Sequence, residues 1–434
     1  MPLTKVSSGV IAANAVVDSF GTQSITGDKL GLTAINANNI VNASITGAKL
    51  AANTVSGDVI GQNAISSNNI VSVSGSTITA NTVANSAFQT GSVENYMTAQ
   101  GLDFGMRNRI INGTMIVDQR NAGANNIISS NSPYTVDRWR AQISQHNGTM
   151  NVRQDSTSTV GFTKSLRAIV TTANTSLPAT SVTRVWTNIE GLNVADLGFG
   201  TANAKPVTLS FFVRSSNTGT FSGALTNYDE NRSYPFEYTI NTVNTFEKKT
   251  ITIPGDTSGN WSSNTDGSFA LNFSLGTGTT NLGTANAWTG SWKVGTTGSF
   301  SLAGVLNATW YLTGVQLEEG SVPTAFEYRQ YGTELALCQR YYEVHGGTAN
   351  AFPQYFGYGS NGTNVGLALP FAVTKRAAPT VTALGTWTVS NCGQPSADSA
   401  TVQGYRLYAT CSSTNTIQFY PASSSEKVTI SAEL

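Results

Sequence analysis

The feature that most constrains this chain is an apolar period of five residues that begins at Val10. It holds as far as Ile70 and, after a slip in register, resumes at Ile78 and runs to Val93. A period of five matches neither the 3.6-residue helix nor the two-residue strand, and a fixed short period is typical of a repeat architecture. The regular apolar positions are Val10, Ala15, Phe20, Ile25, Leu30, Ile35, Ile40, Ile45, Leu50, Val55, Ile60, Ile65 and Ile70.

One chain with this pattern has a single file of apolar residues, which is too narrow to cover itself. The file is buried either in a one-chain solenoid or on an axis shared by several chains. In a solenoid, the residue two positions before each apolar residue would also point inward. An unpaired polar side chain buried at such a position costs about 1–3 kcal/mol. Those positions hold Asp28, Asn38, Asn53, Asp58, Asn63 and Asn68. We therefore expect a trimer whose axial core is the file from Ile25 to Ile70, because three files close an axis symmetrically.

The composition excludes several classes of protein. The 434 residues carry zero net charge, only 11% are charged, and no basic patch suited to nucleic acid is visible. No apolar run approaches the roughly 20 residues of a membrane span, and the first residues lack the apolar core of a signal peptide. Three cysteines are too few for a disulfide scaffold. Cys392 and Cys411 either pair or, as we expect, remain reduced thiols on neighbouring strands.

The residue pattern changes several times along the chain. Residues 1–9 are predicted to be a docking anchor and residues 10–105 a repeat stalk. Beyond them the pattern is mainly β, with alternating apolar runs that predict strands with one buried face. We expect a jelly-roll-like β-sandwich over 106–330, a helical connector over 331–343 and a smaller distal β-sandwich over 344–434. The expected strands lie at 207–213, 236–240, 250–253, 269–275, 310–317, 365–371, 381–384, 405–411, 417–420 and from 427 onward.

Several motifs resemble parts of bacteriophage fibre proteins. Stalk units such as SITGDKL, AINANNI and SITGAKL are similar to the repeats of fibre shafts, which are homotrimers. NRIINGTMIVDQRNAG and YTVDRW, within 108–139, resemble the opening of a fibre β-sandwich that is often compared with carbohydrate-binding modules. Residues 314–343 are similar to the segment that closes that sandwich, and LPFAVTKRAAPTVT, at 369–382, resembles fibre tip domains.

The resemblance implies a homotrimeric fibre of a virion, assembled in the host cytoplasm. It further implies that the N-terminus docks on another virion protein and that the distal β domains recognise a host surface glycan or receptor. We expect a tail fibre, and a capsid-attached head fibre or decoration protein is the alternative. Three tips on each fibre would make weak single-site contacts effective.

Sugar binding needs exposed aromatic faces beside planar polar groups, because a pyranose has an apolar face and a polar rim. In the larger sandwich the candidate residues are Trp186, Tyr228, Tyr234, Trp261, Trp288 and Trp292. Among these we favour Trp288 and Trp292, which share the loop-like segment NAWTGSWK, and the tyrosines of YDENRSY. At the tip the candidates are Tyr355, Phe356 and Tyr358. A single aromatic residue is more often a core residue than a ligand contact.

We expect a binding protein rather than an enzyme. Glycan hydrolysis needs two carboxylates a few ångströms apart, whereas Asp229/Glu230 and Glu318/Glu319 are neighbours in sequence, and neighbours on a strand point to opposite faces. No catalytic serine or zinc motif occurs, and the two histidines, His146 and His345, stand alone. We expect no metal and no cofactor, although Glu318 and Glu319 with backbone carbonyls are a conceivable cation site.

Overall fold

The computed structural model describes residues 106–347 and 352–434. By its internal contacts the chain divides into two units, residues 1–102 and residues 103–434. The predicted anchor, the stalk and its axial file of Ile, Leu and Val lie outside the described residues. The trimer therefore stays a prediction, and the following paragraphs concern the second unit.

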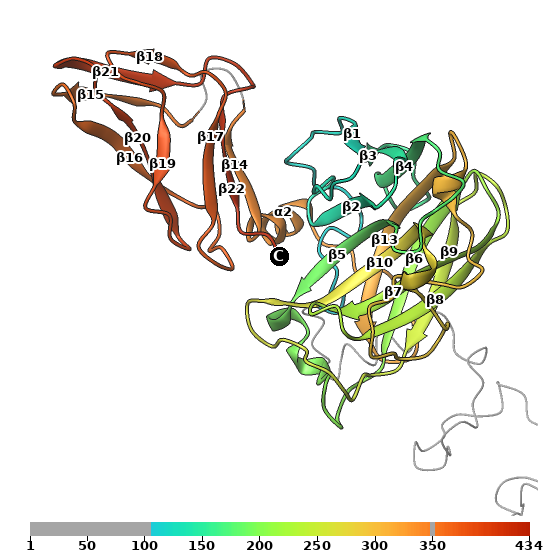
Figure 1. Ribbon diagram of the computed structural model, residues 1–434. Coiled ribbons are helices and arrows are strands. Elements are labelled where there is room, and N and C mark those ends of the chain that lie inside the picture. The colour runs from blue at the N-terminus through green and yellow to red at the C-terminus, as the bar shows by residue number, and fades with distance from the viewer. Residues whose placement is uncertain (1–105, 348–351) are drawn as a thin grey trace, which may run out of the picture. The chain divides into compact units, whose positions relative to one another are not determined.

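The larger part of this unit is a β-sandwich of two antiparallel sheets (Figure 1). The six-stranded sheet has the order β1 (Asn126–Ile128), β3 (Thr149–Asp155), β4 (Ser165–Thr172), β13 (Thr309–Glu319), β6 (Val207–Ser215), β9 (Glu247–Ile253). The five-stranded sheet has the order β2 (Trp139–Ser144), β5 (Val182–Glu190), β10 (Gly267–Thr277), β7 (Gly219–Asn227), β8 (Ser233–Ile240). Most successive strands cross between the two sheets, as in a jelly roll, while β3–β4 and β7–β8 are hairpins within one sheet. The short parallel pair is β11 (Leu282–Gly283) and β12 (Gly295–Thr296), and the 3-10 turns are Gly191–Asn193, Ala195–Leu197, Thr279–Asn281 and Leu302–Gly304.

The inner faces of the two sheets form one hydrophobic core. Phe211 of β6 lies with its ring centroid 5.0 Å from that of Phe273 on β10, and Trp310 of β13 lies 5.6 Å from the same ring. Trp139, the tryptophan of the YTVDRW motif, is fully buried in this core. Alternating apolar residues on the strands build the core, as their sequence pattern predicts.

The Asn112–Gly113 turn holds the opening motif together. Asn112 has a left-handed backbone (φ 58°), and its side-chain amide is hydrogen-bonded to both the N–H and the C=O of Val117 and to the C=O of Asp137. A Cβ at Gly113 would lie 2.2 Å from the carbonyl oxygen of Val315, so only glycine fits there. The Asn112–Gly113 turn therefore has a structural role, because it connects the backbone at Val117 and Asp137 and packs against Val315.

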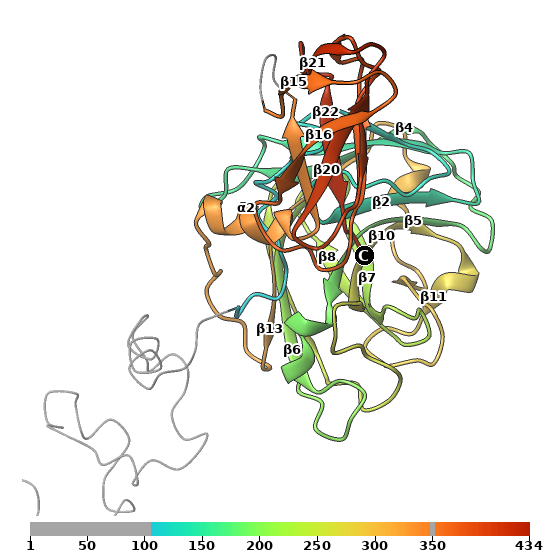
Figure 2. The same cartoon turned by 90° about the vertical axis from the view of Figure 1, so that its left-hand side faces the viewer.

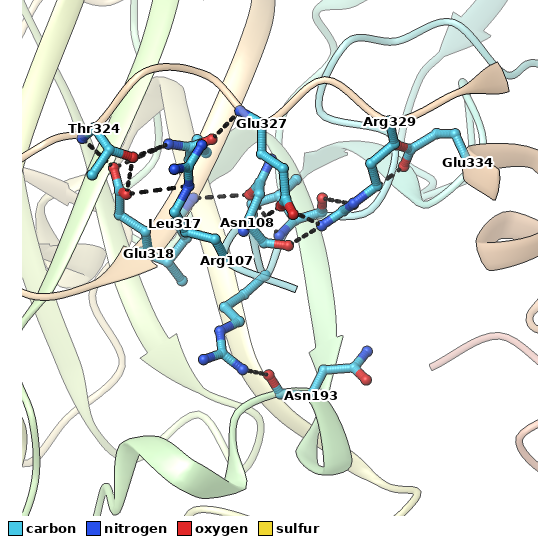
Figure 3. A network of polar contacts seen from close by, with 12 residues as sticks. Arg107, Asn108, Asn193, Leu317, Glu318, Thr324, Glu327, Arg329 and Glu334 are labelled. Carbon is cyan, nitrogen blue, oxygen red and sulfur yellow. Dashed lines mark hydrogen bonds and ion pairs between the residues drawn. The ribbon is translucent and has the colours of Figure 1, made fainter. Parts of the chain in front are cut away.

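Figure 3 shows a second network of hydrogen bonds, which joins the segment after β13 to the first residues of the described chain. The Asn108 N–H donates to Glu327 (2.7 Å), and the Asn108 amide reaches the backbone of β13 at Val315 and Leu317. Arg329 donates to the carbonyl oxygen of Asn108. These contacts, more than 200 residues apart in sequence, join the first and last segments of the sandwich.

Helix α2 (Tyr331–Gln339) follows and leads into β14 (Tyr342–Gly346). The helix predicted over 331–343 is thus present but shorter, because Tyr342 already pairs with Ser431 as part of a sheet. Glu190 of β5 accepts hydrogen bonds from Arg340 (2.6 and 2.9 Å) and from the hydroxyl of Tyr341 (2.5 Å). These contacts fix the end of the connector on the sandwich.

The residues beyond the helix form three small antiparallel sheets around a second core (Figure 2). Their orders are β14–β22 (Lys427–Ser431)–β17 (Thr380–Leu384), β15 (Tyr355–Gly359)–β21 (Asn415–Tyr420)–β18 (Thr388–Ser390), and β16 (Asn364–Pro370)–β20 (Gly404–Thr410)–β19 (Ser396–Asp398). Cys392 and Cys411 are unbonded, buried thiols that face each other across an antiparallel bridge.

Each strand expected from sequence alternation is present. The clearest cases are β6, β10, β13, β16 and β20, whose bounds include or nearly match the predicted runs. The sequence analysis did not predict β1 to β5, β7, β11, β12, β14, β15, β18 or β19, although β2 and β4 do carry an alternating burial pattern.

Candidate functional site

The candidate site lies on the outer face of the five-stranded sheet, the face turned away from the core. The antiparallel register places one row of outward residues side by side: Arg140, Trp186, Asn272, Ala224 and Pro235. The adjacent outward row is Gln142, Arg184, Ser274, Ser222 and Glu237. The outer face of a sheet is usually polar because it meets water. Solubility alone does not require a tryptophan there, so Trp186 beside Arg140 and Arg184 suggests a further role for this face.

Trp186 lies between the guanidinium groups of Arg140 and Arg184. Their Cζ atoms lie 4.7 and 4.2 Å from a ring centroid of the tryptophan, which is within the range of cation–π contact. The ring of Trp292, from the segment between β11 and β12, also lies near Arg184, with its centroid 4.9 Å from Arg184 Cζ. Trp186 is consequently 4% exposed even though it points away from the core.

Two hollows meet beside these residues. The first, about 310 Å³ in volume, is lined by Arg140, Arg184, Trp186, Asn188, Tyr228, Asp229, Glu230 and Ala270. The second, about 500 Å³, is lined by Tyr228, Asp229, residues of the 260–267 loop, Arg376 and Leu434. Tyr228 and Asp229, at the end of β7, line both hollows. Because they share these two lining residues, we refer to the two adjoining hollows together as the groove.

Tyr228 is the accessible aromatic face of this groove, at 41% exposure. Its ring packs against Gly267, where an added Cβ would lie 2.3 Å from Tyr228 Cδ2. Any larger residue at 267 would displace the ring. A 2.8 Å hydrogen bond from the Asn260 side chain orients the carboxylate of Asp229, which forms part of the polar rim beside the Tyr228 ring.

The other aromatic candidates of the sandwich are engaged in packing. Tyr234 is buried, and its ring lies 5.2 Å from that of Trp288. Trp288 donates its indole N–H to the carbonyl oxygen of Pro254 (2.9 Å) and packs edge-on against Trp261. Trp292 is partly buried over Arg184. Of the predicted residues, the structure therefore brings Trp186, Tyr228 and Trp292 to one face and places Tyr234 and Trp288 in an aromatic cluster at the edge of the core.

At the tip, period-two alternation on β15 separates the candidates. Tyr355 points inward and stacks on Phe419 at 5.3 Å, whereas Phe356 and Tyr358 are 63% and 70% exposed on the opposite face. Tyr420 of β21 lies parallel to Phe356, with centroids 6.5 Å apart. The exposed Phe356 and Tyr358, together with the partly buried Tyr420, are the second candidate contact surface.

The carboxylates considered for a cation or for catalysis have structural partners. Glu318 accepts hydrogen bonds from the N–H and hydroxyl of Thr324 (2.9 and 2.5 Å), while Glu319 pairs with Lys205 at 3.0 Å (Figure 3 shows Glu318). His345 Nε2 is hydrogen-bonded to Glu343 Oε1 at 2.8 Å, and His146 Nε2 is hydrogen-bonded to Thr183 Oγ1 at 2.7 Å. Among the described residues, no group of three or more His, Cys, Asp or Glu side chains is placed to hold a metal ion.

Sequence reasoning missed Arg140, Arg184, Asn188 and Asn272. The available signal was the alternation in WRAQIS and VTRVWTNIE, in which every second residue is polar or amphipathic. That alternation shows which residues share the outer face, but it does not show that the β7–β8 turn folds over them.

No family model matches this chain, and no match is found among curated proteins. Among solved structures, the enzymatically active domain of tailspike protein 4 of bacteriophage CBA120 aligns at 12% identity and a TM-score of 0.27, covering 49% of this chain and 21% of that one. A family 11 carbohydrate-binding module of a Clostridium thermocellum cellulase aligns at 12% identity and a TM-score of 0.23, covering 48% of this chain and 100% of the module. A CBM4 structure aligns at 17% identity and a TM-score of 0.22, covering 48% of this chain and 98% of that one. These TM-scores are too low for any of the likenesses to bear on function.

Within the part of the chain that the structure describes, no helix has both the length and the apolar character of a membrane span.

Proposed function

We propose that this chain is a homotrimeric virion fibre that adheres to the host cell surface by binding a glycan, without cleaving it. The observation that carries the binding role is the groove on the outer face of the five-stranded sheet. It combines an accessible ring, Tyr228, with carboxylate, amide and guanidinium groups at its rim. A pyranose needs this combination, because its apolar face stacks on a ring while its hydroxyls take planar hydrogen-bond partners.

The fibre role is supported by the sequence. The five-residue apolar period of the stalk needs partner chains to bury it, and the motifs at 108–139 and 314–343 resemble those of phage fibres. A trimer presents three grooves and three tips, so weak sites suffice for adhesion.

Binding is tested with the full-length protein, intact cells of candidate hosts and the polysaccharide extracted from their surfaces. Saturable binding of a polysaccharide that keeps its chain length supports the proposal. Tyr228→Ala should weaken it about two- to tenfold, which is the range expected for losing one aromatic contact. Tyr331→Ala is the matched control, because Tyr331 is 55% exposed on α2, outside the groove. If both variants bind like the wild type, the groove is not the site.

Shortened polysaccharide chains would instead indicate an enzyme. The specific observation in favour of that alternative is that Asp229 and Asp266 line the same hollow. In that case Asp229→Asn or Asp266→Asn should abolish the shortening while binding persists.

A further inference from the structure

We propose that the groove is selective for an acidic glycan, whose carboxylate pairs with Arg184 in place of Glu230. The proposal rests on the glycan-binding function above and narrows it to a chemical class.

Arg184 is a buried cation whose closest hydrogen-bond partners are neutral. Its side chain is 8% exposed, its Nε donates to Gln142 Oε1 (2.8 Å), and its Nη1 donates to Asn272 Oδ1 (2.8 Å). The rings of Trp186 and Trp292 both lie within cation–π distance of its guanidinium, at 4.2 and 4.9 Å. Neutral amides orient a guanidinium but do not cancel its charge, and a buried charge without a close counter-ion is costly. Burial lowers the pKa of Arg184 to about 10, which reflects this cost.

Glu230 is the only carboxylate paired with Arg184 in the described structure, and the pair is loose. The Oε1 atom of Glu230 lies 3.6 Å from Nη2, longer than the roughly 2.7–2.9 Å of a charge-assisted hydrogen bond. The Glu230 side chain is 53% exposed, and the residue lies on the β7–β8 turn with a left-handed backbone, φ 55°. A carboxylate with half its surface in water is released at little cost.

Two other arginines of the sandwich and connector, Arg232 and Arg340, are paired with buried carboxylates. Arg232 donates to Asp256 through two bonds of 2.6 and 2.7 Å, and Asp256 is 2% exposed. Arg340 contacts the fully buried Glu190 at 2.6 Å. In both pairs the carboxylate belongs to the packed structure. Arg184 differs because its carboxylate comes from a solvent-facing turn at the rim of the groove, where a ligand group would enter.

The groove gives that ligand group a specific place. The planar fork of a guanidinium matches a carboxylate, and Nη2 is the donor that the amides leave to the groove side. Tyr228 and Ala270 line the same hollow and offer apolar surface for the sugar ring that carries the acid. Glu230 occupies the position that a uronic acid carboxylate would take, so the ligand exchanges one carboxylate for another.

The test uses the full-length protein and a surface polysaccharide that binds in the experiment above, before and after carbodiimide–borohydride reduction. The reduction converts each uronic carboxylate to a neutral alcohol and leaves the linkages intact. We expect reduction to weaken binding at least tenfold and added salt to weaken binding of the native form. If the reduced polymer binds as well as the native one, the acidic class is wrong while the glycan-binding function stands. If no candidate host polysaccharide binds in the experiment above, both proposals fail.

Glu230→Gln removes the competing charge and leaves the turn intact. It should tighten binding of the native polysaccharide about two- to fivefold, the size expected for one exposed charge pair, with little effect on the reduced polymer. Glu319→Gln is the matched control, because it makes the same charge change at Lys205, outside the groove. Arg184→Gln should abolish the preference for the native polymer, with the thermal transition checked to exclude unfolding. Equal behaviour of Glu230→Gln and Glu319→Gln would overturn the exchange of carboxylates.

Discussion

Replacing Asn112 with alanine should destabilise the larger sandwich more than any other single change in its opening motif. The buried Asn112 amide makes hydrogen bonds of 2.8 Å to the carbonyl oxygens of Val117 and Asp137, and one of 3.0 Å from the Val117 N–H. Each buried group left without a partner costs about 1–3 kcal/mol, so the three together contribute about 3–9 kcal/mol. Alanine also tolerates the left-handed backbone at 112 poorly, at a cost of about 1–2 kcal/mol.

Asn112→Gly separates the two effects, because glycine accepts the left-handed backbone but loses the same hydrogen bonds. We expect it to be about 1 kcal/mol less destabilising than Asn112→Ala, since glycine also raises the entropy of the unfolded chain. Urea unfolding followed by tryptophan fluorescence measures both, because six of the seven tryptophans lie before residue 331, the exception being Trp387. A loss below about 1 kcal/mol for Asn112→Ala, or wild-type stability for Asn112→Gly, would refute the role assigned to the amide.

Three further changes test other parts of the chain. Burial raises the pKa of Asp137 from 3.8 to about 7, so its contribution to stability is present below pH 4 and is lost as the pH rises through 7. Asp137→Asn should therefore flatten the fall of the melting temperature over that range, and an unchanged pH profile would contradict the shift. Cys392 and Cys411 form a non-hydrogen-bonded antiparallel pair, for which a Cα separation of about 4.5 Å suits a disulfide. Diamide should cross-link them within one chain, as peptide mapping would show, and two thiols that still titrate would contradict the facing geometry. Aspartate at Ile45 and Ile65 should abolish trimers in light scattering, and an intact trimer would exclude the axial core.

The sequence determined the mainly β fold class, the connector helix and ten of the 22 strands in the described part of the chain. Alternation located β6, β10, β13 and, at the tip, β16, β17, β20, β21 and β22, because a half-buried strand must place an apolar residue at every second position. The turn at Asn112–Gly113 is also a local feature, because asparagine tolerates the left-handed backbone found at 112, which most other side chains resist. These are local constraints, and a local pattern expresses them directly.

Only the tertiary structure decided which aromatic rings are available to a ligand. Trp288 and Tyr228 look equivalent in sequence, yet Trp288 packs against Trp261 and Tyr234 while Tyr228 lies open at the centre of the groove. Likewise, alternation places Arg184 on an outer face but does not reveal that Trp292, more than a hundred residues later, covers it. Exposure and charge pairing depend on contacts between segments far apart in the chain, and the residue pattern of one strand carries no information about what folds over it.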